Sequence, residues 1–207
     1  MSTRFGDPYY SLQDGLAETA HVFLAGNDLP ARLRPGFHIA ELGFGTGLNA
    51  LAAWRMWRDS GQSGDLRFTS FEAWPITAAE MTRAHAGFPE LAALSAQLCA
   101  AWSPDRPEIA LPGLRLSVLR GDAAETLPHW AGLADAWFLD GFAPARNPEL
   151  WAPELLAQVA AHTAPGGTAA TYSAAGHVRR ALAAHGFDVT RAPGYGRKRH
   201  MTRAVLA

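Results

Sequence analysis

Short apolar runs alternate along the chain with segments whose apolar residues recur at helical spacing. Residues 37–42 are almost continuously apolar, 134–140 are near-continuously apolar up to a terminal aspartate, and 66–72 alternate between apolar and polar positions. Runs of this length predict buried or half-buried strands. By the same criterion, further strands are predicted at 114–119, 168–173, 187–191 and 200–206.

Helices are predicted between these strands. Apolar residues at helical spacing indicate a helix over 48–58, and residues 149–162 and 174–185 are also expected to be helical. In the predicted helix 77–85, Thr77 precedes Glu80 by three residues, as in a capping box. Gly186 is expected to end the helix 174–185.

This alternation predicts an α/β fold, Rossmann-like, with a seven-stranded and mostly parallel sheet covered by helices on both faces. The loop 192–199 is too short for a crossover helix, so the last two strands should be antiparallel neighbours, with an antiparallel last strand. Residues 87–113 are interpreted as an irregular insertion over one edge, and 165–167 as a turn. We expect a single domain in which residues 1–36 cover the active site and residues 37–207 form the ligand-binding body.

Composition narrows the class of protein. The 207 residues suffice for one sizeable domain, and 48% hydrophobic with 18% charged residues argues against disorder. The single cysteine, Cys99, permits no internal disulfide and no cysteine cluster for zinc, and no function is assigned to it. We expect no metal site. There is no targeting signal and no apolar stretch of membrane-spanning length, so a soluble, cytoplasmic protein is expected.

The net charge of −1 hides an asymmetry. Residues 177–207 carry seven basic residues and one acid, Asp188, whereas the rest of the chain is acidic, and Lys198 is the only lysine. A basic end on an acidic body is consistent with a phosphate-binding patch or with a solvated surface.

A glycine-rich segment, Glu41-Leu42-Gly43-Phe44-Gly45-Thr46-Gly47, joins a predicted strand to a predicted helix. Its G-x-G-x-G spacing fails the dinucleotide fingerprint G-x-G-x-x-G by one position. An acid two residues before G-x-G-x-G resembles motif I of class I S-adenosylmethionine-dependent methyltransferases. The alternative is a glycine turn that merely closes an α/β unit.

Acids also follow the next two strands. Glu72 ends the second predicted strand and Asp122 follows the third. Alone, each would more often be a cap or turn residue, but acids at three successive strand ends favour one shared ligand crevice. Under the resemblance, the predicted cofactor residues are Glu41, Gly43, Phe44, Gly45, Thr46, Gly47, Asn49, Glu72, Asp122, Ala123 and Asp140.

Asp140 ends the fourth predicted strand, in the sequence Trp-Phe-Leu-Asp-Gly-Phe-Ala-Pro. An acid in a partly apolar mouth suits a nitrogen acceptor, because it can accept an N–H and hold the amine in line for attack. We predict that Asp140 is the catalytic residue. The alternative is that Asp140 caps the following turn.

Several of these blocks resemble one family, the methyltransferase domain of MnmC, also called MnmD. The similarity covers nearly the whole chain. It includes the N-terminal signature (Phe5-x-Asp7-x-Tyr9-Tyr10-Ser11, Asp14-Gly15-Leu16-x-Glu18-Thr19), residues 41–49, 137–148 and Gly194-Tyr195-Gly196-Arg197-Lys198-Arg199. Gly6 departs from the acid found in many members.

The resemblance implies methyl transfer from S-adenosylmethionine to the amine of 5-aminomethyl-2-thiouridine at the tRNA wobble position. Arg197, Lys198 and Arg199 would then hold anticodon phosphates, and Tyr9, Tyr10 or Phe142 would stack on the base. Bifunctional members continue into a flavin-dependent oxidase domain that makes the substrate. We therefore expect either a stand-alone methyltransferase or one domain of a longer protein, without flavin in this chain.

Two alternatives remain open at this point. The first keeps the cofactor and changes the acceptor to a small-molecule amine, against which the basic C-terminal end argues. The second is a non-catalytic tRNA-binding partner, against which the full set of four acids argues.

Overall fold

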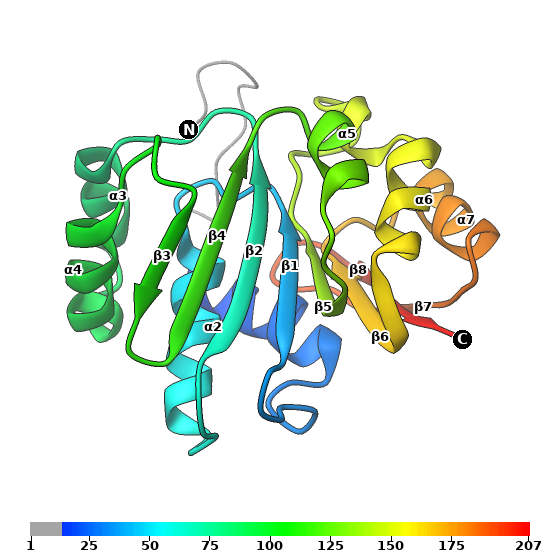
Figure 1. Cartoon of the computed structure of the whole chain (residues 1–207). Helices are drawn as coiled ribbons and strands as arrows, with labels where there is room; N and C mark the ends of the chain where they lie inside the picture. Colours follow the sequence, from blue (N-terminus) through cyan, green and yellow to red (C-terminus); the bar gives the residue numbers. More distant parts are fainter. Residues whose placement is uncertain (1–13) are drawn as a thin grey trace.

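The structure is a computed structural model, and it describes residues 14–207. In this part of the chain a single sheet has the strand order β3-β4-β2-β1-β5-β6-β8-β7 (Figure 1). The strands are β1 (His38–Leu42), β2 (Leu66–Glu72), β3 (Glu108–Leu111), β4 (Leu114–Arg120), β5 (Ala134–Leu139), β6 (Thr163–Thr171), β7 (Phe187–Pro193) and β8 (His200–Leu206).

The centre of the sheet is parallel, as predicted. β4, β2, β1, β5 and β6 run in one direction, whereas β8 is antiparallel to both β6 and β7. The predicted antiparallel pairing of the last two strands is therefore confirmed. The predicted number of seven strands is wrong by one, because β3 adds an antiparallel edge strand beside β4.

Helices cover both faces of the sheet (Figure 1). One face packs against α2 (Leu48–Asp59) and α4 (Ala92–Ala101), with α3 (Ala78–His85) and η3 (Pro89–Leu91) beside them. The other face packs against η4 (Leu127–His129), α6 (Pro153–Ala161) and α7 (Gly176–Ala184), with the short α5 (Ala123–Thr126). The continuously apolar strands β1 and β5 lie between these two apolar layers, and such burial on both faces is why they lack alternation.

The first described residues form α1 (Gly15–Thr19), a π-helical turn η1 (Ala20–Leu24) and a 3-10 turn η2 (Ala25–Asn27). Asp14 caps α1, its side chain accepting from the N–H of Ala17 at 3.0 Å. Thr19 contacts α2 by donating its hydroxyl to Asn49 at 2.7 Å. The segment before β1 is thus tied to the helix that follows the glycine-rich loop.

Three local predictions need correction. Residues 87–113 are not irregular, since they contain η3, α4 and β3, although they do lie at one edge of the sheet. The predicted helix 149–162 is divided into η5 (Pro148–Trp151) and α6, because Pro153 has no N–H to donate and starts a new helix at its first turn. The predicted turn 165–167 lies inside β6, where the register against β5 shifts, and Gly166 has φ +70°.

Other local predictions are confirmed. Thr77 and Glu80 form a capping box at the start of α3. α7 ends just before Gly186, which has φ +91°. Among the described residues no helix has the length and apolar character needed to cross a membrane.

The order of the strands reverses at β1, which has β2 on one side and β5 on the other. Ligands of open α/β sheets bind at the carboxyl ends of the strands beside such a switch point. The glycine-rich loop follows β1 and Asp140 follows β5, so the topology brings these two predicted features to the same place.

Candidate functional site

The glycine-rich loop passes close to the backbone at the end of β5. Gly43 has φ +90°, and a Cβ atom there would lie 2.8 Å from the carbonyl oxygen of Asp140. Gly47 has φ +78° and precedes α2 without any side-chain cap at the start of that helix. Glycine is required at Gly43 both by the conformation and by the close approach.

Residues of α3 and α4, and Trp102 just after α4, contact this loop or the side chains that bind it. The buried ring of Phe44 stacks on Trp102 with centroids 4.9 Å apart. The carbonyl of Thr46 accepts a hydrogen bond from Nε2 of buried His85 at 2.8 Å, and the other ring nitrogen lies 2.8 Å from the hydroxyl of Ser95. Since a carbonyl can only accept, the His85 proton is on Nε2 and Ser95 donates to Nδ1. Burial lowers the pKa of His85, so the imidazole stays neutral.

Asn49 joins two acids of the site. Its Nδ2 donates to Oε1 of Glu41 at 2.9 Å and to Oδ2 of Asp140 at 2.7 Å, while its carbonyl oxygen accepts from Thr19. Ser70 lies 2.7 Å from the second oxygen of Glu41. Glu41 is fully buried, so it supports Asn49 from beneath the loop, whereas Asp140 is only half-buried.

Both acids hold their protons unusually strongly. Burial, and next the charge of Asp140, raise the pKa of Glu41 to about 8 despite the hydrogen bonds from Ser70 and Asn49. Burial raises the pKa of Asp140 to about 7, with Asn49 opposing that rise. A carboxyl group that titrates near neutral pH can both accept and return a proton under physiological conditions.

The two other predicted acids lie at the ends of adjacent strands. The carboxylate of Glu72 accepts from the N–H of Gly45 at 2.9 Å and from that of Trp74 at 2.7 Å. Asp122 caps α5 by accepting from the N–H of Ala124, and Ala123 is buried in the first position of that helix. The N–H of Gly121 donates to the backbone carbonyl of Glu72, which brings the two strand ends together. Glu41, Asn49, Glu72 and Asp140 thus surround the glycine-rich loop.

A further group of side chains lies beside Asp140 and was not predicted. Glu18 of α1 forms an ion pair with Lys198 of the β7–β8 loop at 2.6 Å. The Lys198 ammonium lies 3.8 Å from the centroid of the Tyr172 ring, and the Tyr172 hydroxyl donates to the carbonyl of Gly141 at 2.7 Å. Glu18 raises the pKa of Asp140 and Lys198 lowers it, which places both charges within electrostatic reach of that carboxyl.

The predicted substrate residues are placed differently from one another. Arg197 and Arg199 are exposed, and neither forms an ion pair with any residue in the range 14–207. Lys198 is instead turned towards Glu18 and Tyr172. Phe142 accepts a hydrogen bond at its carbonyl from Trp151. The predicted stacking residues Tyr9 and Tyr10 lie outside the described residues.

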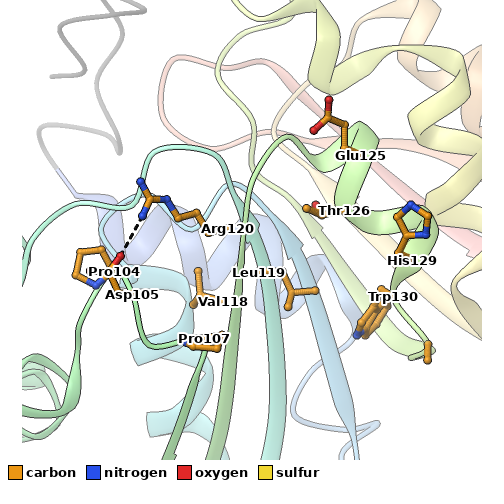
Figure 2. A pocket seen from close by; sticks show the side chains of 11 residues that line it. Pro104, Asp105, Pro107, Val118, Leu119, Arg120, Glu125, Thr126, His129 and Trp130 are labelled. Atoms are coloured by element: carbon orange, nitrogen blue, oxygen red, sulfur yellow. Dashed lines mark hydrogen bonds and ion pairs between the residues drawn. The ribbon is translucent and has the colours of Figure 1, made fainter.

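A separate cleft of about 660 Å³ lies between the 104–107 segment, the end of β4 and the α5–η4 helices (Figure 2). An ion pair between Arg120 and Asp105, 3.1 Å long, lies on one side of it. None of the residues that line it is a predicted site residue.

The geometry can be compared with known proteins. A family model described as S-adenosyl-L-methionine-dependent methyltransferase matches residues 89–207. The chain is 47% identical over its full length to the tRNA 5-methylaminomethyl-2-thiouridine biosynthesis bifunctional protein MnmC of Stutzerimonas stutzeri, and 49% identical over 99% of its length to that of a Caulobacter species. It spans about a third of the length of these curated relatives.

Solved structures agree with the fold. MnmC2 from Aquifex aeolicus superposes with a TM-score of 0.78 at 29% identity, over 98% of this chain and 65% of that one. An amino pentose methyltransferase, CalS10 from Micromonospora echinaspora, solved with S-adenosylmethionine bound, has a TM-score of 0.51 at 14% identity and covers 98% of this chain and 93% of its own, which is a likeness of fold alone.

Proposed function

Because the chain belongs to the S-adenosyl-L-methionine-dependent methyltransferases, we propose that it methylates the primary amine of 5-aminomethyl-2-thiouridine at the tRNA wobble position. The product would be 5-methylaminomethyl-2-thiouridine, the nucleoside in the names of the MnmC relatives. The observation that carries the proposal is the Asp140 carboxyl, fixed by Asn49 beside the glycine-rich loop.

The residues present fit S-adenosylmethionine. Gly43, Gly45 and Gly47 carry no side chains, which lets a ligand approach the backbone of the loop, and the acids around it suit a ligand with a cationic sulfonium and a cationic amino group. Gly43, Gly45, Gly47, Asn49 and Asp140 would hold the methionine end. Glu72 would bind the ribose hydroxyls, and Asp122 with Ala123 the adenine. When bound, S-adenosylmethionine supplies a methyl group that an amine nitrogen can attack.

Asp140 would orient the acceptor amine. A protonated amine has no lone pair, and alkyl amines have pKa values near ~10, as lysine does. A carboxyl group with a pKa of about 7 can accept an amine proton and pass it to solvent. Asn49 donates to Oδ2 of Asp140, and no described residue donates to Oδ1, so that oxygen can receive an N–H of the substrate.

The RNA would be held mainly through its phosphates. Arg197 and Arg199 are exposed on the loop that also carries Lys198, so their guanidinium groups can contact the anticodon backbone without breaking an ion pair among the described residues. The wobble base already lies in a single-stranded loop, which makes it comparatively easy to turn outward. Phe142 would stack on it, together with Tyr9 or Tyr10. A tRNA substrate would place the protein in the cytoplasm.

A partner follows from the chemistry of the substrate. The aminomethyl group would have to be made from a carboxymethylaminomethyl precursor, which is an oxidative step. We assign that step to a flavin-dependent oxidase domain or protein acting upstream, consistent with the word bifunctional in the names of the relatives. The residues of this chain would need only S-adenosylmethionine.

The test is methyl transfer from labelled S-adenosylmethionine to tRNA that bears 5-aminomethyl-2-thiouridine. tRNA bearing the carboxymethylaminomethyl group is the control. We expect label only in the first tRNA. Label in neither, with S-adenosylmethionine still bound, would overturn the tRNA assignment and favour a small-molecule amine acceptor.

Asp140→Asn keeps the size of the side chain and removes the acid. It should weaken S-adenosylmethionine binding by no more than about tenfold, because one charge beside the cofactor is lost, and it should reduce turnover at saturating cofactor at least a hundredfold, which is the order of a general acid–base contribution. Glu80→Gln, at the exposed cap of α3, is the matched control. Equal turnover of D140N and the unaltered protein would remove Asp140 from the mechanism.

A further inference from the structure

Lys198 is bound by two groups that together suit a primary ammonium group. Its Nζ lies 2.6 Å from Oε1 of Glu18 and 3.8 Å from the centroid of the Tyr172 ring. A carboxylate and the face of an aromatic ring are the partners that alkylammonium ligands use. Glu18 keeps only 13% of its side chain exposed, so its charge is directed inward.

This cluster is joined to the proposed acceptor site through two paths. The Tyr172 hydroxyl binds the carbonyl of Gly141, the residue after Asp140. On the other side, Thr19 follows Glu18 in α1 and donates to Asn49, which in turn donates to Asp140. The ammonium group of Lys198 therefore lies within electrostatic reach of the carboxyl that would receive the acceptor amine.

We propose that Glu18 and the face of Tyr172, together with Asp140, form the subsite for the acceptor's aminomethyl group, and that Lys198 occupies this subsite until the acceptor amine displaces it. This inference rests on the proposed function, since it identifies where the amine of that substrate binds. The aminomethyl group and the end of a lysine side chain are both a primary amine on a methylene carbon. The same partners therefore accept either one.

The displacement is energetically accessible. An ion pair with an exposed partner and a single cation–π contact hold Lys198 by a factor of about three to thirty. Once displaced, Lys198 joins Arg197 and Arg199 on the exposed loop, where the RNA phosphates are expected. Entry of the amine would then add one cation to the phosphate-binding surface.

Charged groups other than the substrate also act on this subsite. Asp140 and Glu18 face Lys198 from the end of β5 and from α1, and Glu41 and Glu72 lie behind Asp140 on β1 and β2. Asp14 approaches from the start of α1 through a 3.2 Å hydrogen bond from the Tyr195 hydroxyl. The surroundings are predominantly anionic, which favours a cation in the subsite over a neutral group.

The single lysine of the chain allows a direct test. Lysine-selective 13C labelling yields one ε-methylene signal, and the Tyr172 ring should shift its protons upfield of those of a free lysine peptide. The probe is ethylammonium chloride, with ethanol and equimolar sodium chloride as controls. We expect ethylammonium, and neither control, to move the signal to the free-lysine position.

Two variants test the partners. Because Lys198 and ethylammonium use the same partners, the partners are varied in the Lys198→Met protein, where no internal ammonium group competes. In that protein Glu18→Gln removes the carboxylate and Tyr172→Leu removes the ring, and each should raise the ethylammonium concentration at the midpoint about tenfold when followed by a backbone amide of residues 141–143. Glu80→Gln, an exposed carboxylate on α3, is the matched control and should leave the midpoint unchanged. A signal that moves equally with sodium chloride, or a midpoint unaffected by both variants, would overturn the proposal.

The test of the amine subsite and the test of the proposed function can fail independently of each other. Methyl incorporation into the aminomethyl tRNA tests the reaction, whereas ethylammonium tests the subsite without RNA or methyl donor. Methylation with an unresponsive Lys198 signal would place the acceptor amine elsewhere and refute the subsite alone. Displacement of Lys198 without any tRNA methylation would keep an amine subsite and refute the tRNA assignment.

Discussion

Asn49 is the residue whose loss should have the most distinctive consequence. Its amide group donates to two carboxyl groups that are buried or half-buried, those of Glu41 and Asp140. Asn49→Leu keeps the volume and removes both donors. Within residues 14–207, Ser70 beside Glu41 is the one side chain that still donates a hydrogen bond to either carboxyl group.

The magnitude depends on pH because the two carboxyl groups have pKa values of about 8 and about 7. At pH 6 both hold a proton in the folded protein, and N49L loses two neutral hydrogen bonds to them, about 1–3 kcal/mol together. The hydrogen bond from Thr19 to Asn49 is lost as well, but equally at every pH. At pH 9 both are ionised, and hydrogen bonds to charged groups are each worth about 1.5–3 kcal/mol. The destabilisation should therefore be larger at pH 9 by about 2 kcal/mol.

The unaltered protein has a pH dependence of its own. Both carboxyl groups have folded pKa values above their unfolded values near ~4, so the folded state binds more protons. Their contribution to stability is fully present below pH ~4 and is lost as the pH rises through the folded values of about 7 and about 8. In N49L both folded pKa values rise further, so the loss continues to higher pH.

The assay is urea unfolding at pH 6 and pH 9, without S-adenosylmethionine. The matched control is Asn27→Leu, because Asn27 is also a buried amide, and its side chain donates to the carbonyls of Phe23 and Trp137 and accepts from Thr168, with no hydrogen bond to an acid among the described residues. N27L should lose the same free energy at both pH values. If N49L also lost the same amount at both, the link between Asn49 and the ionisation of these carboxyl groups would be refuted.

Three more predictions concern binding. S-adenosylmethionine should bind roughly tenfold more tightly at pH 8.5 than at pH 6 in calorimetry, because a ligand with net positive charge favours the ionised forms of Glu41 and Asp140. S-adenosylhomocysteine, a zwitterion that lacks the sulfonium charge, is the control, and equal pH dependence of the two would contradict this reasoning. Gly43→Ala should abolish S-adenosylmethionine binding, since the new Cβ meets the Asp140 carbonyl at 2.8 Å, whereas Gly61→Ala, also at positive φ but in open space, should retain it. Replacing Arg197 and Arg199 with serine should weaken tRNA binding and reduce the slope of log affinity against log salt by up to ~2, with S-adenosylmethionine affinity unchanged; an unaltered slope would show that the pair makes no phosphate contact.

The parallel core was predictable because each of its strands is locally distinct. β1 and β5 are apolar runs followed by Gly43 and by Asp140, and either feature marks a strand end without knowledge of the fold. The carboxyl ends of parallel strands meet at one edge, so the sequence alone could place Glu72, Asp122 and Asp140 at the same edge of the sheet. The detailed role of each acid could not be predicted from the sequence. Glu41, for example, is fully buried and accepts a hydrogen bond from Asn49.

The missed elements are those whose formation depends on distant partners. β3 has four residues next to Pro107, and its pairing with β4 supplies the hydrogen bonds that the local sequence does not indicate. α4 is rich in alanine and leucine without a continuous polar face, so its helical period is hidden. A short strand at a sheet edge and a helix without amphipathic contrast are both decided by tertiary packing.

Dependence on distant partners also explains why the sequence alone predicts the same role for Lys198 as for Arg197 and Arg199. In the sequence it stands between two arginines, and a run of three cations indicates a solvent-facing surface. Glu18 is 180 positions away, so only the folded chain brings the two together. The sequence does show that lysine at position 198 is unusual, since every other basic residue of the chain, histidine aside, is arginine. A planar guanidinium spreads its charge over five donors, whereas a compact ammonium on a methylene carbon has the shape of the proposed acceptor group. Lys198, which is proposed to imitate the substrate amine, is therefore also the residue that carries the only lysine ammonium group of the chain.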